Sequence, residues 1–307
     1  MEKRTSVTLD YLDMEPALQL SKSKPDILKK LADELVSSDS VESRIYGYKN
    51  SHGETTSIFI SDFINLDNAF FCTLMDMEEG AAANIPQKLL QSKKFSLEDT
   101  SVSKKKDIIG HIKTATYFLM TPDSVILMRK KGLEKEIVEQ YLSFFLHLEA
   151  PEGKKPLNLL YHPDKNFDVS RIKSFELDDG YKIKEESLFN TVERVLDLRT
   201  ILQAPEMEGL DPEKVLSAKI VFKIKNLPKK DEVENKAVIN RLLTSFNTEN
   251  VTFRDRNNTS IDMSHVKKTK QFQMSIYNSE YPDKNKLIQK MQEFYAEVQN
   301  EKKYSDS

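Results

Sequence analysis

Residues 44–60 read RIYGYKNSHGETTSIFI, and this segment decides the fold. Two runs rich in β-branched and aromatic residues, 44–49 and 55–60, flank a polar turn at 50–53. Two such runs around a short Gly-containing loop are typical of a β-hairpin. We therefore expect an antiparallel sheet organised around this hairpin.

Segments on both sides of the hairpin extend this pattern. Ser6–Asp10 alternates apolar and polar residues and predicts a first strand. Lys24–Asp26 opens a predicted helix with apolar residues at a nearly 3.6-residue period. These apolar residues are Ile27, Leu28, Leu31, Leu35 and Val36. After the hairpin we expect a helix over Gly132–Leu148 and strands at 67–77, 106–114, 116–120, 124–128, 157–162 and 174–177.

The last hundred residues have the clearest pattern. Ala218–Asn226 alternates basic and apolar residues, which predicts a half-buried strand with a basic outer face. A capping-box-like start at Asp231–Glu234 opens a predicted helix that runs to about Phe246. Strands at 251–254 and 270–277 and an amphipathic helix after Pro282 follow. The order β-α-β-β-α predicts an antiparallel α+β unit at the C-terminus.

These elements together predict an α+β protein of two lobes with mostly antiparallel sheets. Glu149–Lys155 contains Pro and Gly, and Gln203–Pro212 is a Pro-bearing linker, so both are predicted breaks. We expect an N-terminal α+β lobe at 1–150, a connecting segment at 151–212, and a C-terminal α+β lobe with a basic sheet face at 213–307.

Glycine, cysteine and histidine usage excludes several kinds of site. The eight Gly are scattered, whereas a dinucleotide fingerprint or a P-loop needs clustered Gly for close approach to phosphate. Cys72 is the one cysteine, which excludes an internal disulfide and predicts a packed, unreactive thiol. The five His lack the paired spacing of a metal-binding helix. We therefore expect neither a cofactor nor a metal ion.

The apolar runs bear on where the protein resides. The longest runs, such as Tyr117–Met120 and Val125–Met128, are far too short to span a bilayer. Met1–Arg4 contains no apolar signal core. We expect a soluble cytoplasmic protein.

Positive charge is concentrated in two segments of a chain whose net charge is −3. Ser103–Lys135 holds eight Lys and Arg against three Asp and Glu, a net of +5. Ser217–Tyr277 holds twelve against six, a net of +6, so the rest of the chain carries −14. Local potential, rather than total charge, decides whether a polyanion docks.

These two segments supply the candidate nucleic-acid-binding residues. The candidates are Lys104, Lys105, Lys106, Arg129, Lys130, Lys131, Lys219, Lys223, Lys225, Arg254, Arg256, Lys267, Lys268 and Lys270. Several charges on one face bind phosphates by displacing counterions. With no helix-turn-helix motif in the sequence, we expect backbone contacts of little sequence specificity. The alternative interpretation is a solvated sheet face in which Lys protects an edge strand.

The C-terminal region resembles a known family. Asn250–Asn258, continuing through Ile261 and Asp262 to Lys267–Met274, is similar to the matching region of the RexA-like phage-exclusion proteins. The resemblance implies a non-enzymatic sensor in phage defence that binds duplex DNA without strong sequence preference. It also implies a homodimer that signals to a membrane-embedded effector protein. It assigns no individual DNA-contacting residue.

Two other functions remain open from the residues alone. Carboxylates and lysines in Glu176–Lys184 have the residue types of a metal-dependent nuclease. The C-terminal amphipathic helix offers an apolar face to a protein partner, as in an adaptor, or else packs on its own sheet. Our leading hypothesis is the DNA-binding protein.

Overall fold

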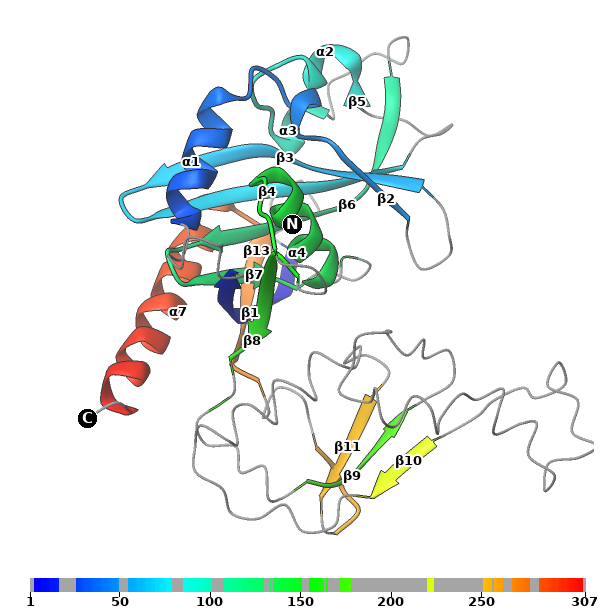
Figure 1. Cartoon of the computed structure of the whole chain (residues 1–307), viewed down its shortest axis with the longest axis vertical. Coiled ribbons are helices and arrows are strands. Elements are labelled where there is room, and N and C mark those ends of the chain that lie inside the picture. The colour runs from blue at the N-terminus through cyan, green and yellow to red at the C-terminus, as the bar shows by residue number, and fades with distance from the viewer. Residues whose placement is uncertain are drawn as a thin grey trace, which may run out of the picture. The chain divides into compact units, whose positions relative to one another are not determined.

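Figure 1 shows the computed structural model of the 307-residue chain. The structure describes residues 3–16, 26–49, 55–78, 85–100, 108–129, 133, 135–150, 155–162, 164, 172–177, 220–223, 251–255, 257–261, 267–276 and 282–305. The chain divides into two compact units, and each is described by itself below. The first unit is Met1–Leu160 with Thr269–Ser307, and the second is Tyr161–Lys268.

A curled sheet organises the first unit (Figure 1). Within the described residues it has nine strands, in the order β13-β1-β7-β6-β4-β3-β2, with β5 beside β6 and β8 beside β1. The strands are β1 (Lys3–Pro16), β2 (Tyr46–Lys49), β3 (Thr55–Leu66), β4 (Ala69–Glu78), β5 (Ile85–Pro86), β6 (Ile108–Met120), β7 (Ser124–Met128), β8 (Leu157–Tyr161) and β13 (Thr269–Ile276). The main pairings are antiparallel, which confirms the expected α+β class with a mostly antiparallel sheet.

The predicted hairpin is confirmed as β2 and β3. Its register pairs Tyr46 with Ile58 and Lys49 with Thr55, while the turn at 50–54 lies outside the described residues. Strand β3 continues past the predicted end to Leu66 through a bulge between Ile60 and Asp62. The predicted strands 106–114 and 116–120 form one strand, β6, because Ala115 is buried in the sheet and does not interrupt it.

Helices cover the sheet where the sequence predicted them. Helix α1 (Ile27–Ser37) begins after Asp26, whose carboxylate accepts a hydrogen bond from the Lys29 N–H at 2.9 Å. Ile27, Leu31 and Leu35 are buried as expected, but Val36 lies on the solvent side. The predicted helix 132–148 forms α4 (Lys135–Phe145). The shorter elements are α2 (Gln87–Leu90), α3 (Leu97–Thr100) and the 3₁₀ turn η1 (Glu42–Arg44).

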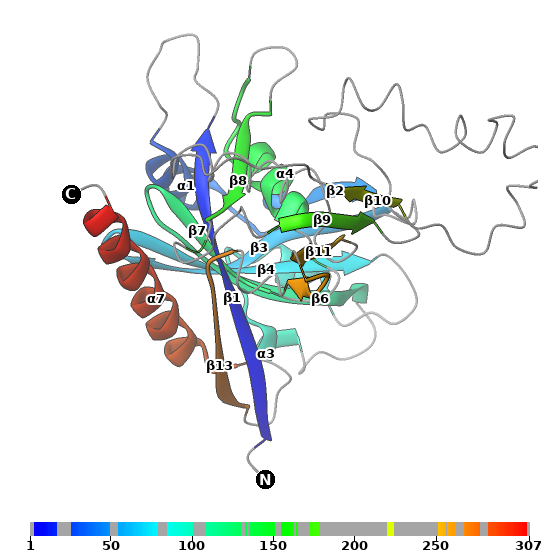
Figure 2. The same cartoon turned by 90° about the horizontal axis from the view of Figure 1, so that it is seen from below.

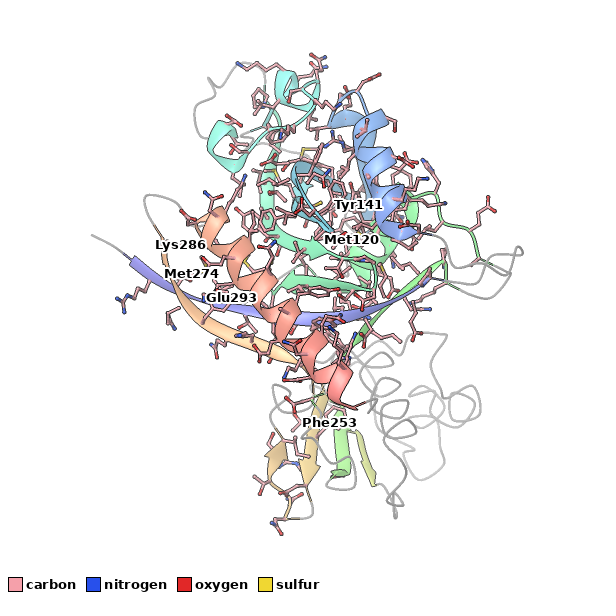
Figure 3. All side chains as sticks on the ribbon, turned by 90° about the vertical axis from the view of Figure 1, so that its left-hand side faces the viewer. Met120, Tyr141, Phe253, Met274, Lys286 and Glu293 are labelled. Atoms are coloured by element: carbon pink, nitrogen blue, oxygen red, sulfur yellow. The ribbon has the colours of Figure 1, made fainter. Side chains whose placement is uncertain are left out.

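Helix α7 (Lys284–Ser305) covers one face of the sheet (Figure 3). Its residues Leu287, Met291, Phe294 and Val298 are buried in one cluster with strand residues that include Leu9, Tyr11, Met128 and Met274. Strand residues of opposite alternation, such as Leu12, are buried outside this cluster. Buried residues of α1 and α4, such as Leu31 and Leu142, also lie outside this cluster, so these two helices pack on the other face of the sheet.

The end of the chain lies in a different unit from the one expected. We predicted one C-terminal lobe over 213–307, but Thr269–Ser307 belong with Met1–Leu160. The reason is tertiary: β13 pairs with β1 from Lys3 to Asp10, and α7 buries its apolar face on the same sheet. The predicted helix at 231–246 lies outside the described residues.

A four-stranded antiparallel sheet forms the described part of the second unit. Its order is β10-β9-β11-β12, from β10 (Ile220–Lys223), β9 (Ile172–Leu177), β11 (Val251–Asp255) and β12 (Ser260–Ile261). Strands were predicted at the first three of these places. The predicted strand 218–226 is described only over β10.

Among the helices that the structure describes, none combines the length and apolarity needed to cross a membrane.

Candidate nucleic-acid interface

Eight of the fourteen candidate residues lie outside the described residues. These are Lys104, Lys105, Lys106, Lys130, Lys131, Lys219, Lys225 and Arg256. The other six are divided between the two units, with Arg129 and Lys270 in the first and Lys223, Arg254, Lys267 and Lys268 in the second.

Arg129 follows β7 and forms an ion pair with Asp10 on β1. Its Nε donates to Asp10 Oδ2 at 3.1 Å and its Nη2 donates to Oδ1 at 2.5 Å. The Asp10 side chain is 5% exposed, whereas that of Arg129 is 44% exposed. The arginine therefore compensates a buried carboxylate while much of its surface still faces solvent.

Lys270 lies on β13 and on the face of the sheet opposite to Arg129. The register pairs Lys270 with Leu9, which lies on the face of the sheet that α7 covers. Lys270 also forms an ion pair with Glu297 of that helix. Arg129 instead binds Asp10, the next residue along β1. Because successive residues of a strand face opposite sides, these two candidates do not share a surface.

Lys267 and Lys268 are buried, contrary to their expected place on a solvated basic face. The Lys267 ammonium lies 4.0 Å from the centroid of the Tyr161 ring, a cation–π contact. The backbone N–H of Lys268 donates to the His162 carbonyl at 2.6 Å. Both lysines therefore contribute to the packing at the first and last residues of the second unit. The run of basic residues in the sequence does not indicate this burial.

Lys223 and Arg254 come together in the second unit. Both positions pair with Ser174, from the two strands that flank β9, and Arg254 also pairs with Ser260. The register thus forms one row across the sheet from Lys223 through Ser174 and Arg254 to Ser260. Neighbouring strands lie about 4.8 Å apart, so the backbones of Lys223 and Arg254 are separated by roughly 10 Å across the sheet.

The next row of the same sheet is apolar. It aligns Phe222, Phe175, Phe253 and Ile261, of which Phe253 is 1% exposed. Successive rows of an antiparallel sheet belong to opposite faces. The register therefore places the Lys223–Ser260 row on the opposite side of the sheet from the apolar row. Within this row Ser174 is 5% exposed, Arg254 is half-buried and Ser260 is exposed.

An acidic residue, Glu176, occupies a register position of the same alternation as the Lys223–Ser260 row. Glu176 pairs with Val221 and Thr252, two residues along β9 from Ser174. The sequence alone did not place Ser174, Ser260 or Glu176 on the same side of a sheet as Lys223 and Arg254. Only the strand register identifies them, because they come from strands far apart in the chain.

The turn after β11 holds Arg254 in place. The Arg254 Nη1 donates to the Asn258 carbonyl at 3.0 Å, and Asn258 has a positive φ of 63°. The Asp255 carboxylate accepts hydrogen bonds from the N–H groups of Asn257 and Thr259 at 2.8 and 2.9 Å. These hydrogen bonds define a turn at Asn257-Asn258 between β11 and β12.

The structure also bears on the cysteine and on the possible metal ligands. Cys72 is fully buried, and burial raises the pKa of its thiol above the ordinary value, which confirms a packed cysteine. Within the described part of the chain, no group of three or more His, Cys, Asp and Glu is arranged to hold a metal ion.

The chain was also compared with known proteins. No family model matches it, and no curated protein does.

Proposed function

We propose that the protein is a non-enzymatic, largely sequence-independent binder of duplex DNA, and that it contacts phosphates through the side of the β10-β9-β11-β12 sheet that carries the Lys223–Ser260 row. The observation that carries this proposal is the register row of Lys223, Ser174, Arg254 and Ser260. Arg, Lys and Ser are common donors to phosphate oxygens, and such contacts carry no sequence information. Ser174 is buried, so the proposed contacts are those of Lys223, Arg254 and Ser260.

The proposal is tested with the full-length protein and a labelled duplex of random sequence. Fluorescence anisotropy across a salt series should give an affinity that falls steeply as salt rises, because binding releases counterions. Lys223→Glu with Arg254→Glu should weaken binding at least ~tenfold at low salt, since reversal replaces attraction to phosphate with repulsion.

The matched control is Lys286→Glu with Lys303→Glu, which makes the same change of charge at exposed positions of α7. Equal losses in the two variants would mean that net charge, and not this sheet, governs binding. Salt-independent binding, or none at low salt, would overturn the proposal. Glu176→Gln should strengthen binding, because it removes a negative charge at a register position two residues along β9 from Ser174.

A role in phage exclusion follows from the resemblance to the RexA-like proteins and is part of the same proposal. In this role the protein acts in the cytoplasm as a homodimer, and DNA binding alters a signal to a membrane-embedded effector. Size-exclusion chromatography with light scattering tests the dimer, and a monomer at cellular concentrations would remove that part.

The structure bears on the adaptor alternative, whereas the nuclease alternative needs an experiment. The adaptor idea required the apolar face of the C-terminal helix to be free, but Leu287, Met291, Phe294 and Val298 are buried on the protein's own sheet. The nuclease idea rested on Glu176–Lys184, of which residues 178–184 lie outside the described residues. Incubation with plasmid and Mg²⁺ or Mn²⁺ separates it from the leading proposal.

A further inference from the structure

The first and last strands of the chain form a two-stranded ribbon at the edge of the first unit's sheet. Strand β13 pairs with β1 from Lys3 to Asp10, whereas the described pairing of β7 with β1 covers only Leu9 to Asp13. In the described registers, the part of β1 before Leu9 therefore extends past its pairing with β7 and stays paired with β13; β8 also pairs with β1. Figure 2 shows the two strands running together towards the N-terminus.

The two faces of this ribbon differ. On one face, Val7 and Met274 are buried in the cluster that includes the apolar residues of α7. On the other face, Arg4, Ser6, Gln271 and Gln273 are exposed. The register places Ser6 opposite Gln273, and the Gln271 amide donates to the Ser6 hydroxyl at 2.7 Å.

The exposed charges on this second face are positive. Arg4 is exposed near the outer end of the ribbon, and Arg129 follows β7 beside Thr8, whose carbonyl accepts its backbone N–H at 2.8 Å. The carboxylate of this face, Asp10, is buried beneath the Arg129 guanidinium. The face thus presents Arg4 and the partly exposed Arg129, which is already paired with Asp10, with hydroxyl and amide groups between them.

We propose that this face of the β1–β13 ribbon is a second contact surface for duplex DNA. Arg, Gln, Ser and Thr are among the side chains that donate to phosphate and sugar oxygens. The backbone from Arg4 to Thr8 spans roughly 14 Å, which matches the ~12 Å major groove. The two arginines then reach phosphates on opposite sides of the groove, and a two-stranded ribbon has the width to lie between them.

This inference rests on the proposed DNA binding and is tested in the same anisotropy assay with the full-length protein. Gln271→Glu with Gln273→Glu places two carboxylates on the ribbon face. Its control is Gln292→Glu with Asn300→Asp, the same charge change at exposed positions of α7. The ribbon variant should bind at least ~fivefold more weakly than the control at low salt, because it repels phosphate locally.

Arg4→Ala supplies a second, milder variant in case the glutamates perturb the strand. It should lower the slope of log affinity against log salt by about one, as expected for one lost phosphate contact. Circular dichroism and a thermal melt establish that each variant is folded.

The outcomes separate the two proposals. If the wild-type protein binds DNA and both ribbon variants bind as tightly as the control, the ribbon surface is overturned and DNA binding stands. If the ribbon variants lose affinity while Lys223→Glu with Arg254→Glu does not, the ribbon is the contact surface and the second unit's sheet is not. No binding by the wild-type protein overturns both.

Discussion

Arg44 shows how a single charged residue stabilises a junction of several segments. Its side chain is fully buried, and burial lowers the pKa of its guanidinium below the ordinary value. The guanidinium donates to the Ile60 carbonyl at 3.1 Å, to the Ser38 hydroxyl at 2.9 Å and to the Lys93 carbonyl. It thereby links the end of α1, the bulge of β3 and the loop after α2.

Replacing Arg44 should destabilise the protein strongly. Arg44→Ala leaves buried carbonyls without their donor and opens a cavity, so the free energy of unfolding should fall by about 3 kcal/mol or more. Urea unfolding followed by circular dichroism measures this change. Arg44→Lys should recover only part of the loss, because an ammonium cannot reach three divergent acceptors. A loss below about 1 kcal/mol would contradict this role.

At the scale of elements, α7 is attached both by its apolar face and by polar contacts at its two ends. Lys284 near its start pairs with Asp62 on β3 at 2.8 Å. Lys302 near its end pairs with Asp13 on β1 at 2.8 Å, and Gln299 donates to Asp123 in the β6–β7 turn at 3.0 Å. These contacts fix the position of the helix along the sheet, while burial supplies most of the free energy.

The apolar face of α7 should dominate its stability. Phe294 is fully buried and its ring meets that of Tyr11 edge to face at 6.1 Å between centroids. Phe294→Ala should reduce the free energy of unfolding by about 3–5 kcal/mol. The exposed neighbour Glu293, labelled in Figure 3, should tolerate Ala within about 0.5 kcal/mol. Equal effects in thermal melts of the two variants would contradict this assignment.

The polar contacts at the end of α7 should depend on pH. Burial opposes ionisation of Asp123, but hydrogen bonds from Gln299, Thr121 and Ser124 and the charge of Lys302 leave its pKa below the ordinary value. A lowered pKa in the folded state stabilises the fold above the unfolded pKa of about 3.9. This contribution is lost as pH falls through the folded pKa.

Asp123→Asn tests the pH dependence directly. Urea unfolding of wild type and variant between about pH 6 and 2.5 should show a stability difference that shrinks in acid, because protonation already removes the charge from the wild-type residue. A difference that stays constant over this range would mean that Asp123 contributes only through its shape and hydrogen bonds.

At the scale of the whole molecule, the first unit is assembled from both ends of the chain. Residues Met1–Leu160 supply most of the sheet, and Thr269–Ser307 return to add β13 and α7. The second unit, Tyr161–Lys268, is thus an insertion between two parts of one core. Without the C-terminal segment, the apolar residues Leu9, Tyr11 and Met128 would lose their cover.

A chain that ends at residue 268 should therefore not form a native first unit. Loss of α7 exposes a large apolar sheet face, which favours aggregation or a loosened core. Dye binding to exposed apolar surface should rise and the cooperative thermal transition should weaken. Truncation after residue 305, which leaves α7 complete, is the control. A native-like melt of the 268-residue chain would show instead that the N-terminal segment folds alone, as the predicted lobe boundary at 150 implied.

The sequence by itself determined the elements and which of their faces are apolar. The hairpin β2–β3, the helices α1, α4 and α7 and the alternating strands follow from periodicity, because backbone geometry and the burial of apolar side chains are local constraints. It also determined that Cys72 is packed. In each case the evidence lies within one short segment of the chain.

Only the tertiary structure decided which strands are neighbours and therefore which charges meet. The sequence pattern made Lys267, Lys268 and Arg129 candidate surface cations. The two lysines are buried, and the partly exposed Arg129 is paired with Asp10. Arg254 and Lys223 share a row, and Arg4 and Arg129 share a face, because strand register joins distant segments. A shift of one residue in register would move each charge to the other face, and no local pattern specifies that pairing.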